Sequence, residues 1–205
     1  KATVLEPAAE EAAAARRLGL DVAVGSIETW DSTDRFGVIL LCRSVEHCVN
    51  LRDAIGRIRS LLLPGGLFYC DVIDFIGCCR DDGPPEAVAK IDHPYWLCQE
   101  TALSIFRSLG LGVVSMNTVV EPNRVGFLLT RCERGEVDPA ARSWSERKVV
   151  ELRRIQSQWD AYGTKPLDVV DWLRRKAYRL KRRMTSFPYS TTWLGSSEAG
   201  CVSML

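Results

Sequence analysis

The side chains best able to do acid–base chemistry here are His47 and His93, the only two histidines among 205 residues. His47 follows Glu46 just after the apolar run FGVILLC, Phe36 to Cys42. An imidazole titrates near neutral pH, so either ring is able to accept a proton during a reaction. The alternative is a structural role, in which His47 caps the helix that follows it and His93 makes hydrogen bonds within a loop.

Polar side chains also follow several predicted strands at the point where each strand ends. In open parallel sheets, ligands bind in the crevice at the carboxyl ends of the strands. The sequence therefore predicts a site built from four strand ends. These are Glu6, Gly25 to Glu28, Cys42 to His47, and Asp71 to Asp74.

The elements that position these residues alternate between strands and helices. Apolar runs predict strands over 2–6, 21–30, 35–42 and 67–75, and a hairpin over 112–133. Helical periodicity predicts helices over 8–19, 51–62 and 98–110. This order is typical of an α/β fold: a Rossmann-like, doubly wound, mostly parallel sheet that ends in an antiparallel hairpin, here with C-terminal helices added.

Charge divides the chain into a front and a back part. Residues 1–138 carry fourteen Lys/Arg against twenty Asp/Glu, a net charge of −6, whereas residues 139–205 carry a net charge of +7. We therefore expect a domain over 1–137, a basic helical extension over 138–185 and a disordered Ser/Thr/Gly-rich tail over 186–205. Ser143 and Glu146 have the spacing of a capping box that opens the first helix of the extension.

Seven Lys/Arg within 174–183 border an apolar stripe. Such a helix is suited to peripheral contact with an anionic membrane, while the favoured alternative is a packed helix with a solvated cationic face. No nucleic-acid partner is expected, because the front part is acidic and offers no strip of mixed basic and aromatic residues.

Eight cysteines lie at 42, 48, 70, 78, 79, 98, 132 and 201, with no C-x-x-C pair. Most lie in apolar runs, which indicates buried thiols in a reducing cytoplasm and neither a metal site nor a disulfide framework. No apolar run reaches the length of a membrane span, and no signal peptide is visible. The Ala/Arg-rich composition is typical of a GC-rich bacterium.

Five segments together resemble the class I S-adenosylmethionine-dependent methyltransferases. The resemblance is to the group with a Glu-His pair after the fourth strand, similar to methyltransferase domains 23 and 11. The segments follow the family's order over about the first 130 residues: VLEP (4–7), VGSIE (24–28), FGVILLCRSVEH (36–47), LLLPGGLFYCDV (61–72) and IDHPYWLCQETALSIFRSLGL (91–111).

The resemblance implies S-adenosylmethionine as cofactor and assigns roles around it. Glu6, followed by Pro7, would bind the ribose hydroxyls, although an acid before a helix is also a common structural feature. Ser26 and Ile27 would contact adenine; serine departs from the family's acid, and Glu28 is an alternative to it. Cys42 and Arg43 would flank the methionine portion of the cofactor.

The resemblance also implies the acceptor side of the site. His47 would face the methyl-transfer centre as a general base and His93 would line the acceptor pocket. Glu46 would contact the substrate, with Tyr95 and Trp96 as an apolar wall. The function implied is methyl transfer to a small-molecule, glycan-linked or lipid-linked acceptor.

One family motif has no counterpart in this sequence. The family's glycine-rich loop should precede VLEP by about 20 residues, but the sequence starts at Lys1. We therefore expect these residues alone to bind the cofactor weakly or not at all, because such loops let the backbone approach the ligand closely. The alternative function is a catalytically impaired methyltransferase-like module for binding or assembly.

Overall fold

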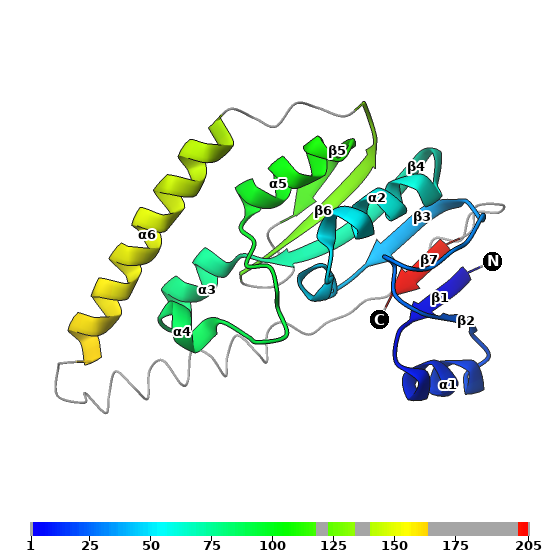
Figure 1. The fold of residues 1–205 in the computed structure, drawn as a ribbon, viewed down its shortest axis with the longest axis horizontal. Helices are drawn as coiled ribbons and strands as arrows, with labels where there is room; N and C mark the ends of the chain where they lie inside the picture. The colour runs from blue at the N-terminus through cyan, green and yellow to red at the C-terminus, as the bar shows by residue number, and fades with distance from the viewer. Residues whose placement is uncertain (1, 118–122, 134–139, 164–200, 205) are drawn as a thin grey trace.

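A single mixed β-sheet organises the protein (Figure 1). The computed structural model describes residues 2–117, 123–133, 140–163 and 201–204. Within these residues the sheet has seven strands in the order β2-β1-β7-β3-β4-β6-β5. The strands are β1 (Ala2–Glu6), β2 (Asp21–Val24), β3 (Phe36–Leu41), β4 (Leu62–Ile73), β5 (Leu111–Asn117), β6 (Arg124–Arg131) and β7 (Cys201–Met204).

Strand direction confirms the predicted fold class. β2, β1, β7, β3 and β4 pair in parallel, and β6 pairs antiparallel with both β4 and β5. The sheet is thus doubly wound and mostly parallel, and it ends in an antiparallel hairpin as the sequence predicts.

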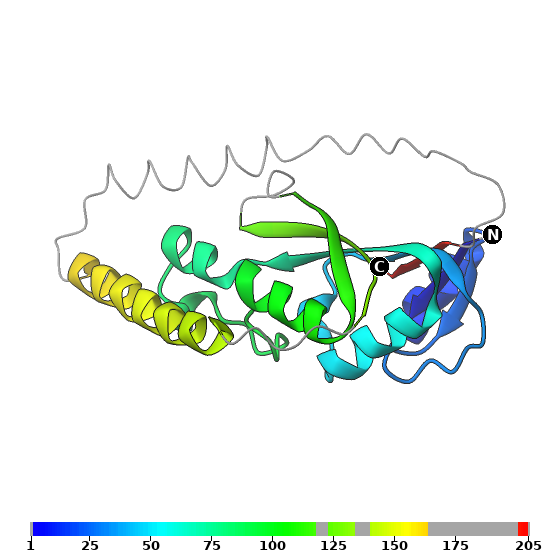
Figure 2. The same cartoon turned by 90° about the horizontal axis from the view of Figure 1, so that it is seen from above.

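Seven helical segments connect the strands in the described part of the chain. They are α1 (Ala9–Arg17), the 3-10 turn η1 (Val45–His47), α2 (Leu51–Leu61), α3 (Phe75–Asp81), α4 (Pro85–Val88), α5 (Gln99–Ser108) and α6 (Ala140–Gly163). Figures 1 and 2 show α2 and α5 on the same face of the sheet. Ile55 and Ile58 of α2 and Phe106 of α5 are almost fully buried there, against Phe68 of β4 and Phe127 of β6.

The ends of α2 follow from local chemistry. The Asn50 side chain accepts a hydrogen bond from the Asp53 N–H and caps the helix, as expected of an N-cap asparagine. The helix ends at Leu61, and β4 begins at Leu62. Pro64-Gly65-Gly66 therefore lies inside β4, which begins five residues before the strand predicted over 67–75.

α6 packs on the front part of the molecule through an apolar cluster. Its Ile155 is buried, and Leu152 and Trp159 are partly buried, against Phe75 and Cys79. The Trp159 indole N–H also donates to the Cys79 carbonyl at 2.8 Å. The helix begins at Ala140, so Ser143 lies within it; the predicted capping-box start at Ser143 is wrong.

The tail contributes one unexpected strand. Residues 201–204, expected within a disordered tail, form β7 between β1 and β3. The basic stretch 174–183 lies outside the described residues, as do 186–200. Within the described part of the chain, no helix combines the length and apolarity needed to cross a membrane.

Candidate functional site

Strand register brings the predicted strand ends to one level of the sheet. Val4 and Leu40 both pair with Ser203, so Glu6 and Cys42, each two residues further on, lie level with one another. Two strand spacings separate them, about 10 Å. Leu41 pairs with Cys70, which puts Cys42 and Asp71 side by side on neighbouring strands. The carboxyl ends therefore meet at one edge, as a parallel arrangement requires.

A buried charge network ties three of these elements together. Arg124, at the start of β6, donates to Asp71 Oδ2 at 2.6 Å and to Glu46 Oε1 at 3.1 Å. The side chain of Glu46 is 4 % exposed and those of Asp71 and Arg124 are 14 % exposed. The Arg43 N–H adds a 2.7 Å hydrogen bond to Asp71 Oδ1, and Arg43 adopts a left-handed backbone with φ of 54°. Asp71 is thereby the link between the ends of β3 and β4.

Arg124 has no role in the sequence analysis. It follows a Pro-Asn turn signal in EPNR, and nothing local marks it as the partner of acids 53 and 78 residues earlier. Only the pairing of Arg124 with Ile73 across β6 and β4 brings its guanidinium to them.

One side-chain oxygen of Glu46 is left unsatisfied within the described part of the chain. Its Oε2 is buried without a hydrogen-bond partner among the described residues. A buried polar atom left unpaired costs about 1–3 kcal/mol, and more when charged, so such atoms require an explanation.

Glu46 lines a small cavity of about 20 Å³ whose walls are otherwise largely apolar. The rings of Phe75 and Trp96 stack there with centroids 4.9 Å apart, and Tyr95 and His93 complete that side. A volume of this size holds about one water molecule. The site therefore combines an unsatisfied carboxylate oxygen with an aromatic wall.

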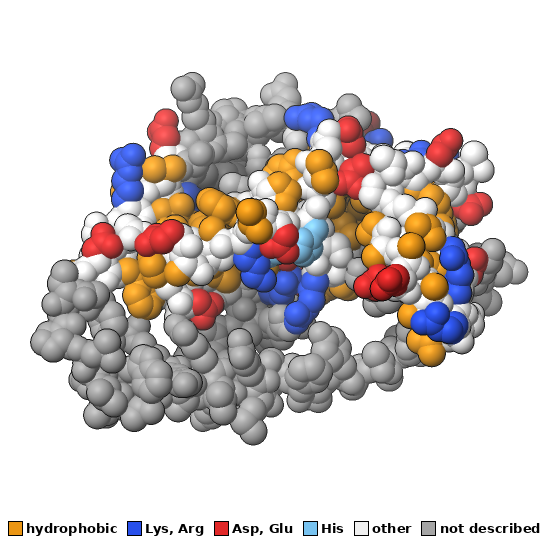
Figure 3. Space-filling view, turned by 60° about the horizontal axis from the view of Figure 1, so that its bottom comes forward, with side chains coloured by type: hydrophobic (Ala, Val, Ile, Leu, Met, Phe, Trp, Pro, Cys, Tyr) orange, Lys and Arg blue, Asp and Glu red, His pale blue; other side chains and the backbone are white. Residues whose placement is uncertain are grey.

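The two histidines meet beside this cavity. Their rings pack edge to face with centroids 4.6 Å apart, although they are distant in sequence. His47 Nδ1 lies 3.1 Å from the Asp92 carbonyl oxygen and 3.6 Å from Asp92 Oδ2. Burial and the neighbouring His47 lower the pKa of His93. In Figure 3 histidine reaches the surface among acidic, basic and apolar side chains.

His47 does not cap the helix that follows it, which was the structural alternative for this residue. Asn50, not His47, caps α2, and the Tyr95 hydroxyl accepts from the N–H of Leu51, the first residue of that helix. The same hydroxyl donates to the Val49 carbonyl at 3.0 Å. Tyr95 thus lines the cavity and anchors the start of α2 with its hydroxyl, while its role as a wall of the acceptor pocket stays a prediction.

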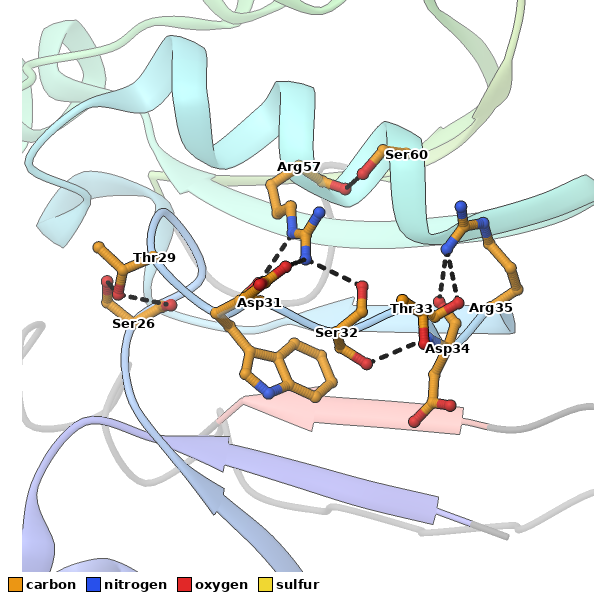
Figure 4. A network of polar contacts seen from close by, with 10 residues as sticks. Ser26, Thr29, Asp31, Ser32, Thr33, Asp34, Arg35, Arg57 and Ser60 are labelled. Carbon is orange, nitrogen blue, oxygen red and sulfur yellow. Dashed lines mark hydrogen bonds and ion pairs between the residues drawn. The ribbon is translucent and has the colours of Figure 1, made fainter.

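The residues predicted to contact adenine have partners within the protein, and their adenine role stays a prediction. Ser26 Oγ lies 3.1 Å from Thr29 Oγ1, Ile27 is buried in the main core, and Glu28 Oε1 accepts from the Val49 N–H at 2.9 Å. Figure 4 shows this loop held to α2 by Arg57, whose guanidinium donates to the carbonyls of Trp30 and Ser32. The loop is thus ordered by contacts within the protein.

Glu6 makes the contact of a helix-start acid, and its ribose-binding role stays a prediction. It is 8 % exposed at the end of β1, and its Oε1 accepts from the Ala8 N–H at 2.8 Å, just before α1. This is the hydrogen bond of a helix-start acid. A carboxylate has about four acceptor positions, so the contact with Ala8 still leaves capacity for a diol.

The architecture matches solved methyltransferase structures at low sequence identity. A methyltransferase from Clostridium acetobutylicum superposes with a TM-score of 0.51 at 12 % identity, over 63 % of this chain and 74 % of that one. A methyltransferase from Thermotoga maritima gives 0.51 at 18 % identity, over 62 % and 72 %. Both use S-adenosylmethionine, as their names state. The fold is that of S-adenosylmethionine-dependent methyltransferases.

A further structure, of a Pyrococcus horikoshii protein, gives a TM-score of 0.52 at 13 % identity, over 64 % of this chain and 71 % of that one. At the level of sequence, no family model and no curated protein matches. The methyltransferase fold is therefore established by three-dimensional arrangement.

Proposed function

We propose that this protein transfers a methyl group from S-adenosylmethionine to an acceptor that is a small molecule or is linked to a glycan or lipid. One observation carries the proposal: His47 and His93, distant in sequence, meet edge to face beside the cavity next to the carboxyl end of β4. This is the edge at which open α/β sheets bind ligands. The fold shared with methyltransferases supports the same assignment.

Different residues of the chain would bind the cofactor and accept the proton. S-adenosylmethionine supplies a methyl group already activated by the positive charge on its sulfur. Alignment of the reacting groups can then contribute about 7–11 kcal/mol. We assign ribose binding to Glu6 and contacts near the methionine portion to Cys42 and Arg43.

On the acceptor side we assign His47 to take up the proton that the acceptor loses on methylation. Glu46 Oε2, buried and without a partner among the described residues, is suited to accept a hydrogen bond from an acceptor hydroxyl or amine. His93, Tyr95 and Trp96 would line the pocket around it.

The adenine side fits this cofactor less well, and that favours a second candidate function. Ser26, Ile27 and Glu28 each make contacts within the protein. Such contacts suit a catalytically impaired methyltransferase-like module, whose function is to bind or assemble with a partner.

Calorimetric titration with S-adenosylmethionine separates the two candidates. The enzyme hypothesis predicts binding that Glu6→Ala weakens by about tenfold, since a hydrogen bond to a charged group is worth about 1.5–3 kcal/mol. Glu10→Ala, on the exposed start of α1, is the matched control and should bind like wild type. No binding at millimolar cofactor would agree with the expectation for a chain without the glycine-rich loop, and would mean that these residues alone do not act as the enzyme.

Transfer of radiolabelled methyl groups to a panel of phenols, amines and sugars tests the catalytic roles. His47→Ala should slow turnover by about 10²-fold or more if the ring acts as general base, and His93→Ala should slow it by a different factor. Full activity in both variants with every acceptor would disprove the site assignment.

A further inference from the structure

We propose that His47, Asp92 and His93 form a binding site for a divalent transition-metal ion at the rim of the cavity. Each residue offers one ligand atom, and these atoms lie within 4.8 Å of one another. The inference goes beyond the proposed function and does not depend on it, because metal binding requires neither cofactor nor acceptor. It also departs from the sequence analysis, in which no metal site is expected.

The distances are close to those of a formed site. His47 Nδ1 is 3.6 Å from Asp92 Oδ2. Metal bonds of about 2.1 Å in tetrahedral or octahedral geometry put neighbouring ligand atoms about 3–3.5 Å apart. The three side chains therefore need to draw together by about 1.5 Å at most. The side chains of His47 and Asp92 are 45 % and 60 % exposed, so rotation into such a geometry meets little packing.

The donor set favours one class of ion. Two imidazoles and one carboxylate suit Zn²⁺, Fe²⁺, Co²⁺ or Ni²⁺, whereas Mg²⁺ and Ca²⁺ prefer all-oxygen sites. Three protein ligands leave further coordination positions open to water or to an oxygen of a bound molecule. Because Asp92 and His47 reach solvent, those positions would be accessible.

The unsatisfied oxygen of Glu46 is an independent observation on the same cavity, since it leaves a buried acceptor free for a ring N–H or a bound molecule. Glu46 lines the same cavity as His93, and its Oε2 has no partner among the described residues. Metal-bound histidines usually donate their second ring N–H to a carboxylate or carbonyl, which fixes the tautomer. Two acids, Glu46 and Asp92, lie near His93 together with the cation of Lys90. Because Arg124 pairs with Glu46, Asp92 is the acid that would balance the charge of a bound metal ion.

Titration of the whole chain with Co²⁺ alone, followed by visible absorption, tests the site. We expect d–d bands to appear without the thiolate charge-transfer band that cysteine ligation would give. Asp92→Asn and His93→Gln should each weaken Co²⁺ binding at least about tenfold. Asp34→Asn, an exposed acid away from the cavity, is the control and should leave the affinity unchanged.

Circular dichroism of each variant confirms that it is folded before its affinity is compared. Absence of Co²⁺ binding at about millimolar concentration would overturn the proposal. So would a thiolate band, or an affinity that neither Asp92→Asn nor His93→Gln changes. Because no cofactor is present in this titration, failure of S-adenosylmethionine binding leaves its outcome unaffected.

Discussion

Arg124 holds Glu46 by a 3.1 Å ion pair in which both side chains are largely buried. The same guanidinium also binds Asp71, so one cation neutralises two acids from different elements. Glu46 belongs to the Glu-His pair that the sequence analysis singles out. Its position in the candidate site therefore depends on a residue 78 positions further along the chain.

Replacing Arg124 should destabilise the fold strongly. Arg124→Met would leave the buried carboxylates of Glu46 and Asp71 without their cation, and breaking a buried pair in this way costs about 3–5 kcal/mol. Urea unfolding measures the loss. Arg107→Met, an exposed arginine on α5, is the control and should change stability by less than about 0.5 kcal/mol. Equal stability of the two variants would contradict the network described above.

Two glycines should respond in opposite directions to alanine. A Cβ at Gly66 would lie 3.0–3.2 Å from the backbone oxygens of Leu63, Phe36 and Gly37, so Gly66→Ala should cost about 1–3 kcal/mol. A Cβ at Gly56, within α2, would have no neighbour within 4 Å, and Gly56→Ala should stabilise by up to about 1 kcal/mol. Thermal unfolding midpoints compare them. A shift of the same sign in both would show that the close approach at Gly66 does not matter.

Acid should loosen the contact between α3 and α6. Burial raises the pKa of Glu151, but hydrogen bonds from Arg80 and Lys148 outweigh it and hold that pKa below 4.5. A depressed carboxyl pKa adds stability above pH 4.5 that disappears as pH falls through the folded-state value. For partly exposed pairs the gain is under about 1 kcal/mol.

The measurement is the stability difference between wild type and Glu151→Gln, which should exist at about pH 7 and vanish near about pH 3. Glu146→Gln, an exposed acid on the same helix, should show no such dependence on pH. A difference that persists unchanged in acid would rule out the ion pairs as its source.

Thiol reactivity should separate Cys132 from the buried cysteines. Burial raises the pKa of Cys48 to about 12 and that of Cys79 to about 11, while Cys132 is exposed. The thiolate is the reactive form. Iodoacetamide at about pH 8 should therefore label Cys132 at least about tenfold faster than Cys48, as followed by peptide mass spectrometry. In guanidinium, which unfolds the protein, the labelling rates of Cys132 and Cys48 should become equal. Equal rates in the native protein would mean that the Cys48 thiol is accessible.

The sequence by itself determined the fold class and the order of the elements in the front part apart from α3 and α4, which no predicted helix covers. The signals that predict these elements depend on residues close together in the sequence. They are apolar periodicity, the N-cap at Asn50 and the strand pattern of the terminal hairpin. The same signals placed Glu6, Cys42 and Asp71 at strand ends, which parallel pairing then brought to one edge. The family resemblance assigns five residues to the acceptor side of the site, and that assignment stays a prediction. Four of them line the cavity: Glu46, His93, Tyr95 and Trp96.

Only the tertiary structure decided which partners these residues have. Arg124 reaches Glu46 because β6 pairs with β4, and His47 meets His93 because the 91–97 segment folds back onto η1. β7 joins the sheet between β1 and β3 although its strand signal is four residues long. Contacts between segments far apart in sequence depend on the whole set of strand pairings and packed faces. For that reason no local pattern predicts them.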